Sequence, residues 1–273
     1  MHWQDARSTL LKELLTKSRI GIVSDFDGTL SLIVDQRDAA QIVPSIKPLL
    51  EALYNHVALL AIVSGRGVAD LYSRINLPDL TYIGNHGLEQ WIDGAARPLP
   101  QAEAYRPAMQ AALSELPKLT QPLSGVDFED KGATLTIHYR LADDPQHAVQ
   151  TLAPLLQELA AQHGLKFSAG KMVFELKPPI QINKGTAFRD LVSEFSLDGA
   201  LFLGDDTTDA DALKAAQSMR ADQSCYALGI GVESADMPPD LRAHADLLVS
   251  DPLDVGSFLG WLLEALSRKA SSS

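Results

Sequence analysis

The sequence predicts an α/β fold with a doubly wound parallel sheet, interrupted by a small inserted α+β domain. Short apolar runs bounded by Gly or Asp occur at residues 20–25, 57–64, 80–84 and 200–205. Helix-length stretches separate these runs, and buried parallel strands have this pattern. The pattern of apolar residues changes between residues 101 and 179, which predicts the insert. We therefore expect a Rossmann-like core that is continued after the insert.

Four half-alternating runs within the insert predict strands, at residues 126–130, 133–139, 165–169 and 172–177. Each pair of runs is split by a short connection that contains Gly, which is typical of a β-hairpin. A helical stretch at residues 145–163 would join the two hairpins. Prolines on either side of the insert resemble linkers. The expected division is a core of residues 1–100 and 180–273 and an inserted domain of residues 101–179.

Length and composition agree with two soluble globular domains. The chain has 273 residues, of which 46% are hydrophobic and 21% charged. A net charge of −12 argues against a nucleic-acid or anionic-membrane partner. Cys225 is the one cysteine, lies in an apolar run at residues 225–230 and cannot form an internal disulfide, which indicates a reducing compartment. With no run of ~20 apolar residues and no cleavable leader, we expect a cytoplasmic protein.

The motif Asp25-Phe26-Asp27-Gly28-Thr29-Leu30 follows the first apolar run. Ligands of open α/β sheets bind at the carboxyl ends of strands, so two carboxylates are presented where chemistry is expected. A calcium loop would require Gly at the position of Leu30. One carboxylate, Asp25, can attack phosphorus, while Asp27 handles protons of the leaving and entering oxygens. A plain turn after a strand is the alternative.

The motif Ser64-Gly65-Arg66-Gly67 follows the second apolar run and puts a hydroxyl, backbone N–H groups and a guanidinium into one loop. Such a loop near a helix start suits a phosphate. The dinucleotide-binding fingerprint is a poor match, because Asp70 replaces its third small residue. We expect Ser64 to bind phosphate, with a structural turn as the alternative.

Two further motifs carry the remaining charges. Lys184 opens a helical stretch, where a cation is unfavourable for the helix dipole. This energetic cost indicates that Lys184 has a function at that position. Asp205, Asp206 and Asp209 crowd together after the apolar run at 200–205. A hard cation such as Mg²⁺ would relieve their repulsion. An ordinary solvated lysine and helix capping by Asp206 or Thr208 are the alternatives, and capping does not account for Asp205.

In this order the four motifs resemble those of the haloacid dehalogenase superfamily of phosphohydrolases, and the insert resembles an α/β cap of that superfamily. The resemblance implies that Asp25 becomes phosphorylated and that Asp27 acts as general acid and then as base. It also implies that Ser64 and Lys184 bind the phosphate. Mg²⁺ would be held by Asp25, the backbone carbonyl of Asp27, and Asp205, with Asp206 and Asp209 orienting its water shell.

Within the superfamily, several segments resemble trehalose-6-phosphate phosphatases. They are Ser64-Gly65-Arg66, Gly84-Asn85-His86-Gly87-x-Glu89, Asp130-Lys131-Gly132 leading to His138-Tyr139-Arg140, Gly170-Lys171-x3-Glu175, and Gly204-Asp205-Asp206-x-Thr208-Asp209. The resemblance implies hydrolysis of trehalose 6-phosphate and a functional coupling to a trehalose-phosphate synthase. The implied substrate-binding residues are Arg66, Asn85, His86, Glu129, Lys131, Lys171 and Glu175.

Other functions stay open at this point. The substrate could be another sugar phosphate, such as sucrose 6-phosphate, mannosyl-3-phosphoglycerate or a hexose phosphate. A phosphomutase would pass the phosphoryl group to a second sugar. A non-catalytic sugar-phosphate sensor is a further alternative, but the joint presence of Asp25, Asp27, Ser64, Lys184 and Asp205 argues against it. The charges of the insert could also do no more than solvate its hairpins.

Overall fold

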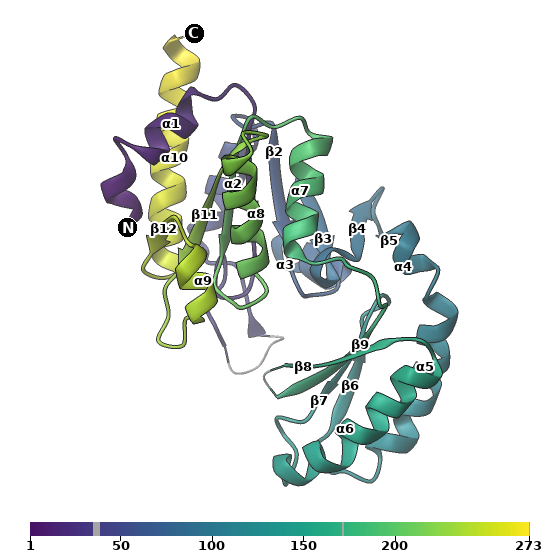
Figure 1. Cartoon of the computed structure of the whole chain (residues 1–273). Helices are drawn as coiled ribbons and strands as arrows, with labels where there is room; N and C mark the ends of the chain where they lie inside the picture. The colour runs from purple at the N-terminus through teal and green to yellow at the C-terminus, as the bar shows by residue number, and fades with distance from the viewer. Residues whose placement is uncertain (35–38, 171, 273) are drawn as a thin grey trace. The chain divides into compact units, whose positions relative to one another are not determined.

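The computed structural model describes residues 1–34, 39–170 and 172–272. The chain forms two compact units, one made of Met1–Gly87 and Ile182–Ser273 and the other of Leu88–Gln181. We call them the core unit and the inserted unit (Figure 1). The core unit is thus assembled from two separate stretches of the chain, as the sequence predicts.

The core unit contains a parallel sheet with the strand order β12-β11-β10-β1-β2-β3. These strands are β1 (Ile20–Ser24), β2 (Leu59–Val63), β3 (Thr81–Gly84), β10 (Gly199–Gly204), β11 (Tyr226–Val232) and β12 (Leu247–Val249). The four apolar runs predicted as strands are confirmed, and so is the doubly wound class. The chain runs outward from β1 in one direction and from β10 in the other, so the strand order reverses between them. Ligands of such sheets bind at this reversal, outside the carboxyl ends of the strands.

Both faces of this sheet are buried, which explains the unbroken apolar runs. Helices α7 (Lys184–Glu194) and α8 (Ala210–Ala221) cover one face, where Val23 and Phe202 belong to their apolar core (Figure 1). The alternate strand residues, such as Ile22 and Leu201, are also buried and point to the opposite face. The remaining helices of the core unit are η1 (Trp3–Ala6), α1 (Leu10–Thr16), α2 (Ile46–Tyr54), α3 (Val68–Ile75), η3 (Asn85–Gly87), α9 (Pro239–His244) and α10 (Pro252–Ser272).

The inserted unit is a two-layer α/β structure. Its antiparallel sheet has the order β6-β7-β9-β8, and α5 (Arg106–Thr120) and α6 (Pro145–Gln162) pack on one face. The strands are β6 (Asp127–Asp130), β7 (Leu135–His138), β8 (Lys166–Gly170) and β9 (Val173–Lys177). Both predicted hairpins and the helix between them are confirmed. Ile137 and Phe174 pair across β7 and β9 and face the two helices, which leaves a polar face on the other side of the sheet.

The inserted unit begins at Leu88, before the boundary expected after residue 100. The earlier segment contains β4 (Glu89–Ile92), β5 (Ala95–Pro98) and α4 (Pro100–Glu103), and the two strands pair as an antiparallel hairpin. Asp93 and Gly94 form its tight turn, with φ of 52° and 76°. Asp-Gly at a two-residue turn is a strong hairpin signal that the sequence analysis passed over.

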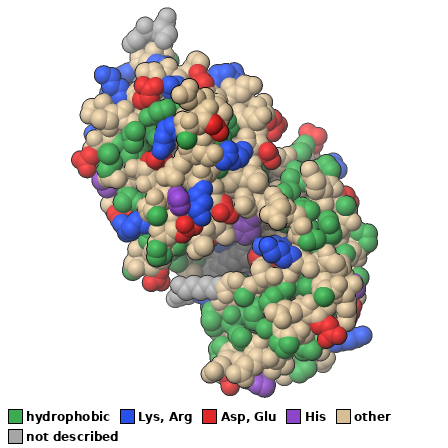
Figure 2. Space-filling view, in the orientation of Figure 1, with side chains coloured by type: hydrophobic (Ala, Val, Ile, Leu, Met, Phe, Trp, Pro, Cys, Tyr) green, Lys and Arg blue, Asp and Glu red, His purple; other side chains and the backbone are tan. Residues whose placement is uncertain are grey.

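Two surface properties bear on partners. Lys, Arg, Asp and Glu side chains are intermixed over the described part of the face in Figure 2 and are not gathered into a basic field. Within residues 1–34, 39–170 and 172–272, no helix has both the length and the apolar character that a membrane crossing requires. The expected absence of a nucleic-acid partner stays a prediction.

Candidate active site

The four motifs lie at one edge of the core sheet. Asp25 directly follows β1, Ser64 follows β2, and Asp205 follows β10. Lys184 is the first residue of α7, which begins with a capping box between Asn183 and Thr186. Because adjacent parallel strands end at the same edge, residues far apart in the sequence come together at the strand-order reversal.

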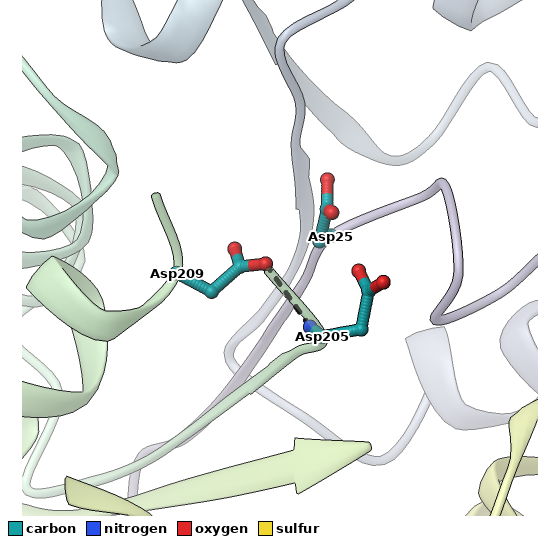
Figure 3. A group of neighbouring side chains, drawn as sticks. All are labelled: Asp25, Asp205 and Asp209. Atoms are coloured by element: carbon teal, nitrogen blue, oxygen red, sulfur yellow. Dashed lines mark hydrogen bonds between the residues drawn. The ribbon is translucent and has the colours of Figure 1, made fainter. Parts of the chain in front are cut away.

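The central feature of the site is a group of three carboxylates, Asp25, Asp205 and Asp209 (Figure 3). Each offers one oxygen, and these oxygens all lie within 4.8 Å of one another. The second oxygen of Asp209, Oδ2, accepts hydrogen bonds from the backbone N–H of Asp205 and of Asp206, both at 3.1 Å. Asp209 is fully buried, so it fixes the loop that presents Asp205.

Lys184 is the cation of this group. Its Nζ donates a hydrogen bond to Asp209 Oδ1 at 2.8 Å and forms an ion pair with Asp25 Oδ1 at 3.0 Å. Only 1% of the residue is exposed, which rules out the solvated lysine considered above. Burial works against its charge, but the carboxylates of Asp209, Asp25 and Asp206 outweigh burial and raise the pKa of Lys184 well above its ordinary value. Lys184 is therefore charged and held in place.

One lysine does not balance the acidic residues around it. Burial, together with the charges of Asp206, Asp205 and Asp27, raises the pKa of Asp25 to about 7 against the opposing effect of Lys184. Burial and the charges of Asp209 and Asp206 raise the pKa of Asp205 to about 8. Apart from its ion pair with Lys184 at 3.0 Å, the buried Asp25 Oδ1 accepts no hydrogen bond from the described residues. Clustered carboxylate oxygens short of positive charge fit a hard divalent cation.

Asp206 lies outside the group of three and is different in character. Its side chain is 50% exposed. Its Oδ1 accepts hydrogen bonds from the backbone N–H and the hydroxyl of Thr208, both at 2.7 Å. Partial burial works against ionisation, but the charge of Lys184 and the hydrogen bonds from Thr208 and Asp209 lower the pKa of Asp206 to about 2. Asp206 thus orders the turn before α8 but does not cap the helix, whose N-cap position is occupied by Asp209.

The carboxylate of Asp27 also lies outside the group of three, because it pairs with Arg66. Arg66 donates from Nε to Asp27 Oδ2 at 2.7 Å and from Nη2 to Asp27 Oδ1 at 2.6 Å. Arg66 Nη1 donates to Asp70 Oδ2 at 2.9 Å. The resemblance implies that Arg66 binds substrate, and this stays a prediction. The signal for the pairing with Asp70 is the four-residue spacing of Arg66, Asp70 and Arg74, of which the last two lie on α3.

The loop after β2, which contains Ser64 and Arg66, is hydrogen-bonded to the turn after β3. Asn85 N–H donates to Arg66 O at 2.8 Å, and His86 N–H donates to Ser64 O at 2.9 Å. The turn has left-handed φ values of 49° at Asn85 and 58° at His86, which are costly for residues with a side chain. A Cβ at Gly65 would lie 2.5 Å from the His86 ring, so this close approach requires glycine. Ser64, Asn85 and His86 therefore form one connected edge of the site.

Two of the predicted sugar-binding residues of the inserted unit, Glu129 and Glu175, lie on its polar sheet face. Glu129 on β6 pairs with Thr136 on β7, which pairs with Glu175 on β9. Directly opposed residues point to the same face, so the three form a row. Lys131 lies in the connection after β6, where its backbone N–H donates to Thr134 O. Lys171 lies outside the described residues.

The fold and the strand-end charges have the arrangement that the resemblance to haloacid dehalogenase phosphohydrolases implies. The family model described as trehalose-phosphatase matches residues 23–236. The chain belongs to this family.

Individual relatives agree with the family assignment. The chain is 32% identical over 275 residues to the trehalose-phosphate phosphatase of Mycobacterium leprae, covering 96% of this chain and 62% of the relative. It is 34% identical over 260 residues to that of Mycobacterium marinum, covering 93% of this chain and 64% of the relative. The chain thus spans less than two thirds of the length of these relatives.

Solved structures show the same fold. The C-terminal domain of the Candida albicans trehalose-6-phosphate phosphatase superposes with a TM-score of 0.76 at 24% identity, covering 94% of this chain and 97% of that one. A trehalose-6-phosphate phosphatase related protein gives a TM-score of 0.75 at 22% identity, covering 91% and 99%.

Proposed function

We propose that this chain hydrolyses trehalose 6-phosphate to trehalose and inorganic phosphate through a phosphorylated Asp25. The observation that carries the proposal is the buried group of Asp25, Asp205, Asp209 and Lys184 at the strand-order reversal. Lys184 fixes the nucleophile while lowering the repulsion between a carboxylate and a phosphate dianion. Membership in the trehalose-phosphatase family supports the choice of substrate.

The reaction divides into two displacements at phosphorus. In the first, an Asp25 oxygen bonds to phosphorus while the bond to the sugar oxygen breaks, and Asp27 gives its proton to that oxygen. In the second, water attacks phosphorus, Asp27 takes its proton, and the Asp25 carboxylate is released. Lys184 and the Ser64 hydroxyl hold the phosphoryl oxygens. Proton transfer of this kind contributes about 10²–10⁴-fold to the rate.

The carboxylates fit a divalent cation, and we propose Mg²⁺. Asp25 and Asp205 would hold it together with the backbone carbonyl of Asp27. Both oxygens of Asp209 already accept hydrogen bonds, from Lys184 on one side and two backbone N–H groups on the other, so Asp209 orients the site. When bound, the metal supplies positive charge that stabilises the transferring phosphoryl group. Chelation should stop phosphate release, Mg²⁺ should restore it, and Ca²⁺ should be a poor substitute because of its looser coordination.

We propose that the inserted unit acts as the cap domain and supplies the sugar specificity. An uncharged disaccharide presents hydroxyls, which are recognised by fixed donors and acceptors. The row of Glu129, Thr136 and Glu175 offers such groups on a rigid sheet, and the hydroxyl of Thr136 is buried without a hydrogen-bond partner among the described residues. Lys131 and Lys171 are the further expected donors. This role would explain why the polar face carries charges in register.

The test is release of phosphate from trehalose 6-phosphate beside sucrose 6-phosphate and glucose 6-phosphate. Trehalose 6-phosphate should have the highest kcat/KM, and Asp25→Asn, which is nearly isosteric, should abolish turnover with the fold intact. A higher kcat/KM for another sugar ester would mean that trehalose 6-phosphate is not the preferred substrate. Activity within about tenfold of the parent in the Asp25→Asn variant would remove the proposed nucleophile, since covalent catalysis requires it.

The same assay separates the other classes. A phosphomutase would need a sugar bisphosphate and would release little free phosphate, whereas a sensor would bind the ester without turnover. Cytoplasmic location and coupling to a trehalose-phosphate synthase stay predictions. A pull-down with the synthase would test the coupling.

A further inference from the structure

The Arg66 guanidinium forms a buried fork on Asp27. The two N–H···O bonds, at 2.7 and 2.6 Å, run in parallel from Nε and Nη2 to the two carboxylate oxygens. Arg66 is 1% exposed, while the side chain of Asp27 is 44% exposed. A two-point fork fixes both the position and the plane of a carboxylate, which a single hydrogen bond does not.

A second anchor holds the fork itself. Asp70 on α3 accepts from Arg66 Nη1 at 2.9 Å and from Arg74 Nε at 2.9 Å. Arg74 Nη1 donates to Ala40 O at 2.8 Å. Asp70 and Arg74 lie four residues apart on α3, and Arg66 lies in the loop just before this helix. The Arg66 guanidinium is therefore held by Asp70 as well as by Asp27.

We propose that Arg66 is a positioning residue for Asp27, and that Asp70 holds Arg66 in place for this task. The inference rests on the proposed function, in which Asp27 exchanges a proton with the sugar oxygen and with water. An ionised carboxylate offers about four lone-pair sites. The fork occupies one on each oxygen, so each oxygen keeps a second site, and the Asp27 side chain is partly exposed to solvent. The proton can thus be exchanged while Arg66 stays bound.

This assignment differs from substrate binding by Arg66. Its guanidinium is almost fully buried, and the contacts described above commit three of its nitrogens to Asp27 and Asp70. A residue that binds the phosphate would affect every phosphate ester alike, and one that binds the sugar would mainly raise KM for the sugar ester. A residue that positions the general acid affects only those esters whose leaving group needs a proton.

The experiment compares trehalose 6-phosphate, an alkyl ester, with para-nitrophenyl phosphate, whose leaving group departs without a proton. Arg66→Gln should lower kcat for the sugar ester roughly 10- to 100-fold, as expected for a misplaced catalytic group, with KM little changed. The aryl ester should lose only a few-fold. Asp27→Asn should show the same selectivity, and adding Arg66→Gln to it should cause no further loss on the sugar ester.

Other variants test the geometry. Arg66→Lys keeps the charge without the fork and should recover only part of the loss. Asp70→Asn should give a smaller loss with the same selectivity, and it carries the test if Arg66→Gln does not fold. Arg220→Gln is the matched control, because Arg220 forms a similar pair with Asp246 elsewhere in the core unit. It should leave the ratio of the two esters unchanged.

Two results would overturn the positioning role. One is that Arg66→Gln lowers turnover of both esters equally, and the other is that it lowers turnover of the sugar ester as much in the Asp27→Asn variant as in the parent. Failure of the proposed function looks different, because the parent enzyme would then leave trehalose 6-phosphate intact. If the parent hydrolyses another sugar phosphate, the comparison is made with that ester. If it hydrolyses neither sugar nor aryl esters, both proposals fall. The Nε–H NMR signal of Arg66 tests the pair itself, and it should shift in Asp27→Asn and not in Arg220→Gln.

Discussion

The two units place their charged residues in opposite ways. In the core unit Asp25, Lys184 and Asp209 are at most 3% exposed and touch one another. In the inserted unit the side chains of Glu129 and His138 are 41% and 34% exposed and lie 3.4 Å apart. Buried charges depend on every partner, whereas hydrated ones can be changed singly. In the proposed function, the chemistry thus depends on a tightly coupled group, and recognition depends on residues that can vary without loss of the fold.

The largest expected effect comes from removing the buried cation. Lys184→Met should abolish turnover of both sugar and aryl esters and destabilise the protein by about 3–5 kcal/mol, because it leaves buried carboxylates without their partner. Urea unfolding at neutral pH gives the stability. Lys214→Met is the control, since Lys214 also pairs with an aspartate but is 43% exposed, and it should cost at most about 1 kcal/mol. Equal losses in the two variants would contradict the contrast between buried and hydrated charges.

A second effect is on the pH dependence of the metal-free protein. The pKa values of Asp25 and Asp205 are raised to about 7 and about 8 in the folded chain, whereas unfolded aspartates titrate near 4. The folded state therefore binds more protons, and its stability falls as pH rises from about 4 to 8. Mg²⁺ favours the ionised forms, so it should raise Tm by several degrees more at pH 8 than at pH 5.5.

Calorimetry with chelator and with Mg²⁺ measures this difference. Asp25→Asn should reduce the pH-dependent part of the Tm increase that Mg²⁺ causes. Amide exchange in β6 to β9 should not show this pH dependence, because the carboxylates with raised pKa values belong to the core unit. A Tm increase from Mg²⁺ that is equal at both pH values would contradict the assignment of these carboxylates.

The third comparison uses two glycines with nearly the same backbone. Gly28 in the core unit and Gly94 in the inserted unit have φ of 72° and 76°. A Cβ at Gly28 would lie 2.1 Å from Asp205 Oδ2, whereas nothing lies within 4 Å of one at Gly94. Both alanine variants should lose about 1–2 kcal/mol for the left-handed conformation. Only Gly28→Ala should also lose turnover and raise the Mg²⁺ concentration needed for half-activity, and full activity there would mean that the site tolerates movement of Asp205.

The smallest effect on stability is expected on the polar face of the inserted unit. Glu175→Ala and Lys131→Ala should each lower the efficiency ratio of trehalose 6-phosphate to para-nitrophenyl phosphate roughly 10- to 100-fold, because a hydrogen bond to a charged group is worth about 1.5–3 kcal/mol. Their melting temperatures should change little. Lys118→Ala, on the exposed side of α5, is the control. Comparable losses on both esters would mean that these charges only solvate the sheet.

Local sequence was sufficient for the parallel core, the two hairpins of the insert and the strand-end motifs. Continuous apolar runs require two buried sheet faces, and alternating runs require one, so periodicity alone separated the two units. It did not find the β4–β5 hairpin, because its strands are short and half-exposed. The Asp93-Gly94 turn was the signal for it.

The tertiary structure decided how the charges are shared. Motif order brought Asp25, Lys184 and Asp205 to one edge, but the sequence did not show that Asp209 is saturated by Lys184 and two backbone N–H groups. Nor did it show that Arg66 holds Asp27. These pairings join residues up to 39 positions apart, and they depend on burial, which decides which charges must find a partner. Sequence spacing determines which groups arrive at the site, and packing determines which of them bind one another.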